Sequence, residues 1–273
     1  MLRYLRQGLT AALKQPFAVC VLYVYQFAWG ILLYKWVQSI IVPLLHRYPA
    51  GDQPQSAVHL FLMESQFRLV KTDLIQPYLE WLLILLAVRM LISPMLNAGV
   101  LYSLEHRQMN AGYRFMKGIR ELLLPFFLYY LLQTVLMLAP LYWLAPKALA
   151  LFNKAYGFEQ LLLSMLPWTA LYAVYALLVR LLFLFLQFGR ASEDRRGLLS
   201  VLPVVFRQGL RIAGNALLLV LLGFLLAVAA TYASYIWAGL TALIIHQIYP
   251  LVRTFVKMWS IAAQREIWES YRT

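Results

Sequence analysis

Long runs of apolar residues, separated by short segments with charges, prolines and glycines, dominate the chain. A run of about 20 apolar residues matches the hydrocarbon core of a bilayer, where a helix satisfies its own backbone hydrogen bonds. The longest runs lie at residues 17–34, 81–88, 122–132, 161–179 and 216–230. We therefore expect an all-α, polytopic membrane bundle with about six transmembrane helices. The predicted spans are residues 17–42, 78–100, 122–144, 161–188, 215–236 and 239–262.

Six spans form three hairpins and place both chain termini on one side of the membrane. The sequence signal for the boundary between the last two spans is weak, because residues 216–248 are almost continuously apolar and only Ala238 and Gly239 indicate a turn. A five-span alternative, with the termini on opposite sides, stays open at this stage.

The longest predicted connection covers residues 43–77. Prolines at positions 43, 49 and 54 open it, and a modestly amphipathic stretch follows at 58–70, where Glu64 and Arg68 have i,i+4 spacing. We expect this segment to lie on the outer membrane surface.

Composition supports a membrane protein and excludes several kinds of chemistry. Of the 273 residues, 63% are hydrophobic and 13% are charged, whereas a soluble domain has roughly a quarter charged residues. Cys20 is the only cysteine, so neither an intramolecular disulfide nor a cysteine-ligated metal site can form. The first apolar run is a full span without a small-residue cleavage site, and we interpret it as a retained helix rather than a signal peptide.

The net charge of +13 does not indicate nucleic-acid binding, because the basic residues follow the apolar runs instead of forming one soluble patch. Most lie in the N-terminus, in segments 101–121 and 189–215, and in the C-terminal tail after residue 262. Positive charge is enriched in cytoplasmic loops of membrane proteins. We therefore expect a multi-pass protein of the bacterial cytoplasmic membrane with cytoplasmic N- and C-termini.

An internal repeat relates the three predicted hairpins. The second helix of each contains a Val-Arg pair, at Arg89, Arg180 and Arg253, and a glycine follows the first two arginines after 29 residues, at Gly118 and Gly209. The elements that carry these residues are Leu86-Ala87-Val88-Arg89, Leu177-Leu178-Val179-Arg180, Pro250-Leu251-Val252-Arg253, Phe115-Met116-Lys117-Gly118-Ile119-Arg120, Phe206-Arg207-Gln208-Gly209-Leu210-Arg211 and Leu5-Arg6-Gln7-Gly8-Leu9.

Equal spacing without a gap favours duplication. We infer one membrane domain over residues 1–273, built from repeats at about 1–104, 105–196 and 197–273. Each repeat is a basic amphipathic helix on the cytoplasmic side, followed by a transmembrane hairpin. Such helices lie in the headgroup plane, where basic side chains face anionic lipid. The predicted interfacial lipid contacts are Arg6, Lys117, Arg120, Arg207 and Arg211.

This arrangement resembles the membrane domain of bacterial glycerophosphoryl diester phosphodiesterases and related uncharacterised bacterial polytopic membrane families. The resemblance covers nearly the whole chain and rests on the repeated pattern of basic helix, glycine and hairpin. The catalytic unit of that family is a separate soluble barrel, for which this chain has no room. The resemblance therefore implies fold and membrane association, not phosphodiesterase activity.

Charged residues inside the predicted spans are the main candidates for a binding site. Arg89 lies more than about 15 Å from its helix end, beyond easy snorkelling reach. Together with Arg180, Arg253 and Lys257 it can form an intramembrane site for an anionic headgroup or solute. The alternative is that each arginine snorkels or pairs with carbonyls of a neighbouring helix. His246 lies seven residues before Arg253 and is a weaker candidate, for proton relay.

No catalytic or metal motif is present. His46, His59, His106 and His246 are scattered, and the sequence has no His-Glu-x-x-His pattern, Gly-x-Ser-x-Gly elbow or phosphate loop. We expect no enzyme activity, no cofactor and no metal.

Two function classes follow. The preferred hypothesis is an integral membrane protein that binds or organises anionic lipid or a membrane partner. The alternative is a transporter, or a permease subunit driven by an ATPase, with an arginine-lined anion pathway. The charged loop Ser192-Glu193-Asp194-Arg195-Arg196 can contact a cytoplasmic protein in either case, although a solvated turn explains it as well.

Overall fold

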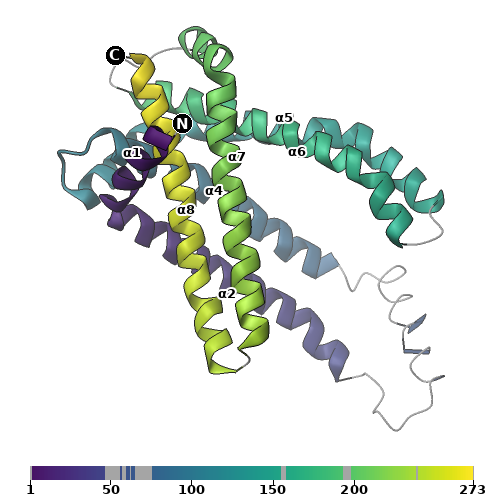
Figure 1. Cartoon of the computed structure of the whole chain (residues 1–273). Helices are drawn as coiled ribbons and strands as arrows, with labels where there is room; N and C mark the ends of the chain where they lie inside the picture. Colours follow the sequence, from purple (N-terminus) through teal and green to yellow (C-terminus); the bar gives the residue numbers. More distant parts are fainter. Residues whose placement is uncertain are drawn as a thin grey trace. The chain divides into compact units, whose positions relative to one another are not determined.

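The computed structural model describes residues 2–46, 76–154, 158–192, 198–237 and 239–272, together with positions 56, 60, 61, 63 and 64. The predicted amphipathic stretch at 58–70 lies largely outside the described residues. In the described part, every regular element is a helix (Figure 1). The helices are α1 (Leu2–Leu13), α2 (Pro16–Leu45), α4 (Gln76–Glu105), α5 (Ala111–Lys154), α6 (Phe158–Ala191), α7 (Leu198–Ile236) and α8 (Leu240–Arg272).

Five of the described helices are long and apolar enough to span a membrane. These segments are Pro16–Pro43, Gln76–Glu105, Ala111–Leu151, Glu159–Ala191 and Arg207–Ile236. The chain is thus an all-α, multi-pass membrane protein, as the apolar pattern predicts. Helix α8 has 33 residues, but it is not one of the five. It contains His246, Arg253 and Lys257, which lower its hydropathy.

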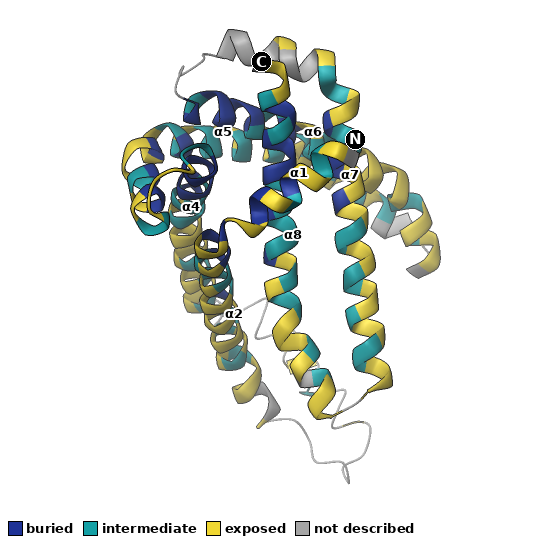
Figure 2. Ribbon diagram, turned by 60° about the vertical axis from the view of Figure 1, so that its left-hand side comes forward, coloured by how far each residue is buried: buried dark blue, intermediate teal, exposed yellow. Residues whose placement is uncertain are grey.

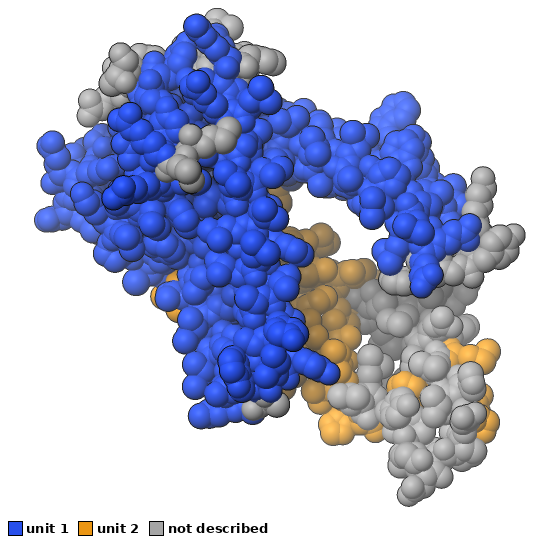
Figure 3. Space-filling view, in the orientation of Figure 1, with its two compact units in different colours: residues 1–21, 94–273 blue, residues 22–93 orange. Residues whose placement is uncertain are grey.

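The chain divides into two compact units (Figure 3). Unit 2 comprises Leu22–Ser93, which includes the greater parts of α2 and α4. Two contacts join these helices within the unit. The indole nitrogen of Trp36 donates a hydrogen bond to the carbonyl of Tyr78 over 3.2 Å. The guanidinium carbon of Arg89 lies 5.3 Å from the ring centroid of Trp29.

Unit 1 comprises Met1–Val21 and Pro94–Thr273. In it α1 packs on α8, α8 packs along α7, α5 packs along α6, and α6 contacts α7 (Figure 1). The indole nitrogen of Trp259 in α8 donates to the carbonyl of Leu5 in α1 over 2.8 Å, so both chain termini lie at the same end of this unit. We call this end the termini end.

The core of unit 1 lies at the termini end, where buried residues gather on α1 and on the adjoining parts of the other helices (Figure 2). The large buried side chains include Leu104, Phe115, Phe126, Phe183, Phe185, Ile212, Met258 and Ile267. Away from this end, apolar side chains such as Leu163, Tyr235 and Leu240 are exposed. In a bilayer, lipid chains cover such side chains, so their exposure needs no protein partner.

Two features of the helix boundaries differ from expectation. The residues after 262, which we expected to form a C-terminal tail, continue α8 as far as Arg272. The predicted basic helices of the second and third repeats are continuous with the spans that follow them, in α5 and α7. Only α1 is separated from its span, by the break before Pro16, whose missing N–H suits the first position of a helix.

Tyrosines of α6 hold α5 where a proline interrupts its hydrogen bonds. Pro140 cannot donate to the carbonyl of Leu136, four residues before it. The Tyr175 hydroxyl donates to that carbonyl over 2.8 Å, and the Tyr172 hydroxyl donates to the carbonyl of Met137 over 3.2 Å. A backbone group that the bilayer would leave unsatisfied is therefore paired, and the same bonds fix α6 against α5.

Glycines permit close helix contacts at the termini end. A Cβ atom at Gly8 of α1 would lie 2.6 Å from the backbone of Ala263 in α8, and one at Gly118 of α5 would overlap Tyr102 in α4. A Cβ atom at Gly209 of α7 would meet nothing within 4 Å. The three glycines of the proposed repeat therefore differ: two are needed for packing, and the third is not.

This difference predicts opposite effects of two alanine substitutions. Gly8→Ala forces α1 away from α8, and we expect it to destabilise the protein by about 1–3 kcal/mol. Gly209→Ala adds a methyl group in open space within a helix, and we expect a gain of up to about 1 kcal/mol from helix propensity. Thermal unfolding of the two variants in one detergent compares them; equal effects would contradict the close α1–α8 contact.

The number of membrane crossings can be tested by labelling. If α8 crosses the membrane alongside α7, residues 241 and 271, near its two ends, are accessible from opposite sides. In a Cys20→Ser background, we expect a membrane-impermeant maleimide to label Thr241→Cys and Tyr271→Cys from different sides of sealed vesicles. Labelling of both positions from the same side would support five spans instead.

Candidate functional site: mid-helix arginines and basic helix faces

The three arginines of the repeat are exposed and lie in the interiors of long helices. Arg180 in α6 and Arg253 in α8 belong to unit 1, and Arg89 in α4 belongs to unit 2. In α6 and α8, a buried residue directly follows the arginine: Leu181 after Arg180 and Thr254 after Arg253. In α4, the next buried residue after Arg89 is Pro94, five positions later.

The surroundings of the arginines differ. Arg89 stacks over Trp29, a cation–π contact that contributes roughly 0.5–2 kcal/mol. For Arg180 and Arg253, no ion pair is found among the described residues. A common site formed by Arg89, Arg180 and Arg253 stays a prediction.

Lys257 lies one turn after Arg253 on α8 and is half-buried, with interactions of its own. Thr254, between them, is fully buried, and its hydroxyl donates to the carbonyl of Pro250 over 2.8 Å. Arg253 and Lys257 thus share one side of the helix, as their spacing predicts. His246 is exposed on the same helix.

The five predicted interfacial residues all lie at or near helix surfaces. Arg6, Arg120, Arg207 and Arg211 are exposed, and Lys117 is half-buried, with its Nζ 3.7 Å from a carboxylate oxygen of Glu121. Each of these helices also has buried residues: Gly8, Ala11 and Ala12 of α1, Phe115 and Gly118 of α5, and Ile212 of α7. On α7, Leu210 beside Arg211 is 90% exposed. Of the apolar residues that precede Arg207 in α7, most have side chains outside the described set.

One basic residue of the segment 101–121, which we expect on the cytoplasmic side, is buried. Arg114 is 5% exposed, and its guanidinium donates to the side-chain oxygen of Gln15 over 2.7 Å and to the carbonyl of Arg107 over 3.1 Å. Gln15 and Ser103 are joined by two further bonds, of 2.8 and 2.9 Å. This network connects Gln15, between α1 and α2, with α4 and α5. Charge counting could not have found it, because Gln15 and Ser103 are distant in sequence.

A second buried arginine, Arg265, organises a cluster of carboxylates. Its Nε donates to Glu105 over 3.0 Å, its Nη2 to Glu269 over 2.5 Å, and its Nη1 lies 3.7 Å from Glu266. Arg107 also donates to Glu266, over 2.9 Å. These contacts fasten the last turns of α8 to the end of α4. The i,i+4 spacing of Arg265 and Glu269 was the sequence signal for part of this cluster.

Several buried polar atoms between α7 and α8 lack hydrogen-bond partners within the described structure. Both amide atoms of Asn215 and the amide oxygen of Gln264 are among them, although Gln264 donates to the carbonyl of Ile212 over 3.0 Å.

No group of three His, Cys, Asp or Glu side chains among the described residues is placed to hold a metal ion. The carboxylates at the termini end already bond to Arg107 and Arg265. The described surface of the helices carries exposed arginines and lysines beside apolar side chains.

Comparison with protein-family models, with curated proteins and with solved structures found no match for this chain.

The carboxylate cluster predicts opposite effects of two conservative substitutions. Glu105→Gln removes a carboxylate from a guanidinium that is 5% exposed, and we expect a loss of about 1–3 kcal/mol of stability at pH 7. Burial raises the pKa of Glu269 above its ordinary value of 4.5, and the neighbouring Glu266 and Glu105 add to this, while Arg265 opposes it. Ionised Glu269 is therefore destabilising, and Glu269→Gln should be neutral or stabilising at pH 7.

The sign of the pH effect follows from the raised pKa. The folded protein binds the Glu269 proton more tightly than the unfolded chain, so this group's destabilising effect is complete above the folded pKa and disappears as the pH falls to 4.5 and below. The advantage of Glu269→Gln over wild type should shrink over the same interval. Thermal unfolding between pH 4 and 8 measures it, and an advantage that grows on acidification would contradict the assignment.

Proposed function

We propose that this protein binds or organises anionic lipid, or another anionic membrane component, through the basic faces of the helices at its termini end. The termini end is the cytoplasmic side in this proposal, as the distribution of lysine and arginine favours. The protein acts as a binding or scaffold protein, without catalysis.

The observation that carries the proposal is the arrangement of charge on these helices. Arg6 on α1, Arg120 on α5 and Arg207 and Arg211 on α7 are exposed, while other residues of the same helices are buried, among them Ala11, Phe115 and Ile212. The packing of these buried residues keeps the basic side chains on the outside. Each such cation adds about 1 kcal/mol near an anionic leaflet, and the effect falls off within a Debye length.

The three mid-helix arginines support a second place at which the protein contacts anionic headgroups. An exposed guanidinium in the interior of an apolar helix is costly in hydrocarbon unless it reaches phosphate, water or a polar partner. Anionic headgroups drawn toward Arg89, Arg180 and Arg253 would supply that partner. Lys257, one turn from Arg253, adds a further cation on α8.

The same arginines favour the alternative function, a transporter or ABC-type permease subunit. In that case Arg89, Arg180 and Arg253 line an anion pathway, and movement of one hairpin against the others opens it to each side in turn. Solute-dependent flux in liposomes, or an ATPase bound at the termini end, would favour this class. The charged segment 192–196 is a candidate contact for such a partner; only Ser192 of it lies in the described structure, where it is buried.

The resemblance to the membrane domain of glycerophosphoryl diester phosphodiesterases fits the lipid-binding proposal. The proposed topology has six spans in three hairpins, with a basic helix before each.

Native mass spectrometry of the purified protein with its co-purifying lipids tests the proposal. We expect wild type to retain an anionic phospholipid selectively. Arg207→Gln with Arg211→Gln should reduce this retention about tenfold or more, given about 1 kcal/mol for each cation. Alanine at Arg89, Arg180 or Arg253 should reduce it as well if these residues contact headgroups.

Lys35→Gln is a matched control, since Lys35 is an exposed lysine of α2 whose Nζ contacts Gln38 in the same helix. It removes one charge from the predicted outer side and should leave retention at the termini end unchanged. Lipid retention that is unaffected by all the arginine variants would overturn the proposal, and flux measured with the same variants would then test the transporter alternative.

A further inference from the structure

A groove lies between α5 and α6, far along these helices from the termini end, and has a volume of about 350 Å³. This size falls within the range of about 300–1,000 Å³ for sites that hold small molecules. Leu141, Leu144 and Leu151 of α5 and Met165 and Tyr172 of α6 are among the lining residues. The groove lies wholly within unit 1.

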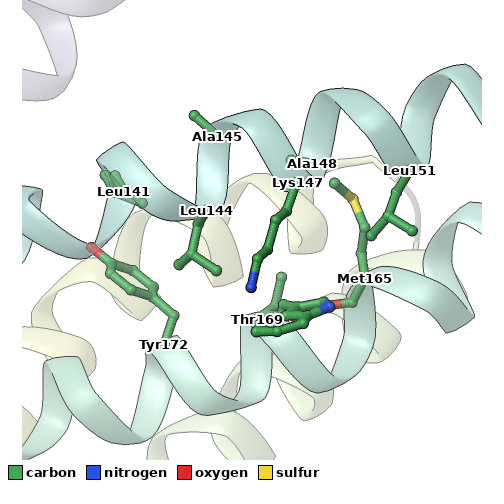
Figure 4. A pocket seen from close by; sticks show the side chains of 10 residues that line it. Leu141, Leu144, Ala145, Lys147, Ala148, Leu151, Met165, Thr169 and Tyr172 are labelled. Atoms are coloured by element: carbon green, nitrogen blue, oxygen red, sulfur yellow. The ribbon is translucent and has the colours of Figure 1, made fainter.

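The lining of this groove is apolar except for one cation, Lys147, and a few hydroxyl groups. The Nζ atom of Lys147 lies 4.0 Å from the ring centroid of Trp168, and both residues line the groove. Figure 4 shows Lys147 and Leu144 pointing from α5 toward α6. Within the described part of the chain, no carboxylate forms an ion pair with Lys147.

The other polar groups of the lining already have partners. The Tyr172 hydroxyl donates to the carbonyl of Met137, and the Thr169 hydroxyl donates to the carbonyls of Met165 and Leu166. The Lys147 ammonium has three N–H donors, and its contact with the Trp168 ring leaves them able to bind an anion. The groove thus offers one cation at an otherwise apolar surface.

From this geometry we infer that the groove binds a single anionic phospholipid, with its phosphate on Lys147 and one acyl chain along Leu144 and Leu141. This site lies at the opposite end of the helices from the basic faces described above. It is independent of the proposed function, because none of its residues belongs to those faces.

The dimensions of the groove agree with such a ligand. Lys147 is six positions after Leu141, about 9 Å along the helix, and the lining toward Leu141 and Tyr172 is apolar. One leaflet of the hydrocarbon core is about 15 Å thick. With its phosphate at Lys147, the lipid would therefore extend one acyl chain into the leaflet, alongside Leu141 and Tyr172. Trp168 then lies in the interface, where tryptophan is enriched.

Brominated lipids, which quench nearby tryptophans, test this site in the intact protein. Wild type and Trp168→Phe are reconstituted into phosphatidylcholine vesicles with a small, equal fraction of either brominated phosphatidylglycerol or brominated phosphatidylcholine. The difference between the two proteins isolates the signal of Trp168. We expect brominated phosphatidylglycerol to occupy the groove about fivefold more than brominated phosphatidylcholine, as expected for one cation near an anionic headgroup.

Charge variants test whether Lys147 causes the preference for phosphatidylglycerol over phosphatidylcholine. Each variant is compared with the same variant carrying Trp168→Phe. Lys147→Gln should abolish it, Lys147→Arg should retain it, and Lys35→Gln and Arg207→Gln should leave it unchanged. Equal quenching by the two brominated lipids, or equal loss in Lys147→Gln and Lys35→Gln, would overturn the inference.

Soluble glycerol phosphate distinguishes a lipid from a free phosphate. If millimolar glycerol phosphate in the buffer removes the preference, the ligand is a soluble phosphate and the lipid site is rejected. Persistence of the preference supports the lipid. Loss in Arg207→Gln but not in Lys147→Gln would assign the selectivity to the termini end, which would reject the groove and leave the proposed function intact.

Discussion

Helices in a bilayer gain little from burying leucine against leucine, because lipid chains are equally apolar. Unit 1 therefore depends on contacts that lipid cannot replace, and these gather at the termini end. Gly8 allows α1 to lie against Ala263 of α8, Arg265 of α8 binds Glu105 of α4, and Arg114 of α5 bonds to Gln15. These contacts fasten the helix ends to one another, while exposed apolar side chains further along the helices have lipid as their natural neighbour.

The sequence pattern was sufficient to predict the class of fold. Apolar runs of span length predicted the five helices that are long and apolar enough to cross a membrane, and Gly239, with a φ of 90°, lies at the expected turn, between α7 and α8. The pattern could not show that α5 and α7 continue without a break through the interface, because a basic amphipathic stretch and an apolar stretch are both good helix formers. In α5, Pro125 lies close to this joint, three residues after the predicted start of the span, and the helix nevertheless continues through it.

The candidate site was predicted less completely, for a physical reason. Arginines inside apolar runs stand out in a sequence, and Arg89, Arg180 and Arg253 were identified in this way. Arg114 and Arg265 lie among other charges and look like surface residues, although both are almost fully buried. Their partners come from helices far away in the sequence, and one-dimensional periodicity holds no information about such pairs. The groove beside Lys147 could not be predicted for the same reason, because its lining residues come from both α5 and α6.

Continuity between a basic helix and its span also has a mechanical consequence. From Arg207 to Ile236, α7 is one helix without an internal proline, about 45 Å long, whereas the bilayer core is about 30 Å thick. A change in bilayer thickness that tilts this rod must also displace Arg207 and Arg211 relative to the headgroups. On α1, by contrast, the break before Pro16 separates Arg6 from the tilt of α2. Hydrophobic mismatch is thus transmitted to the charges of the third basic helix and not to those of the first.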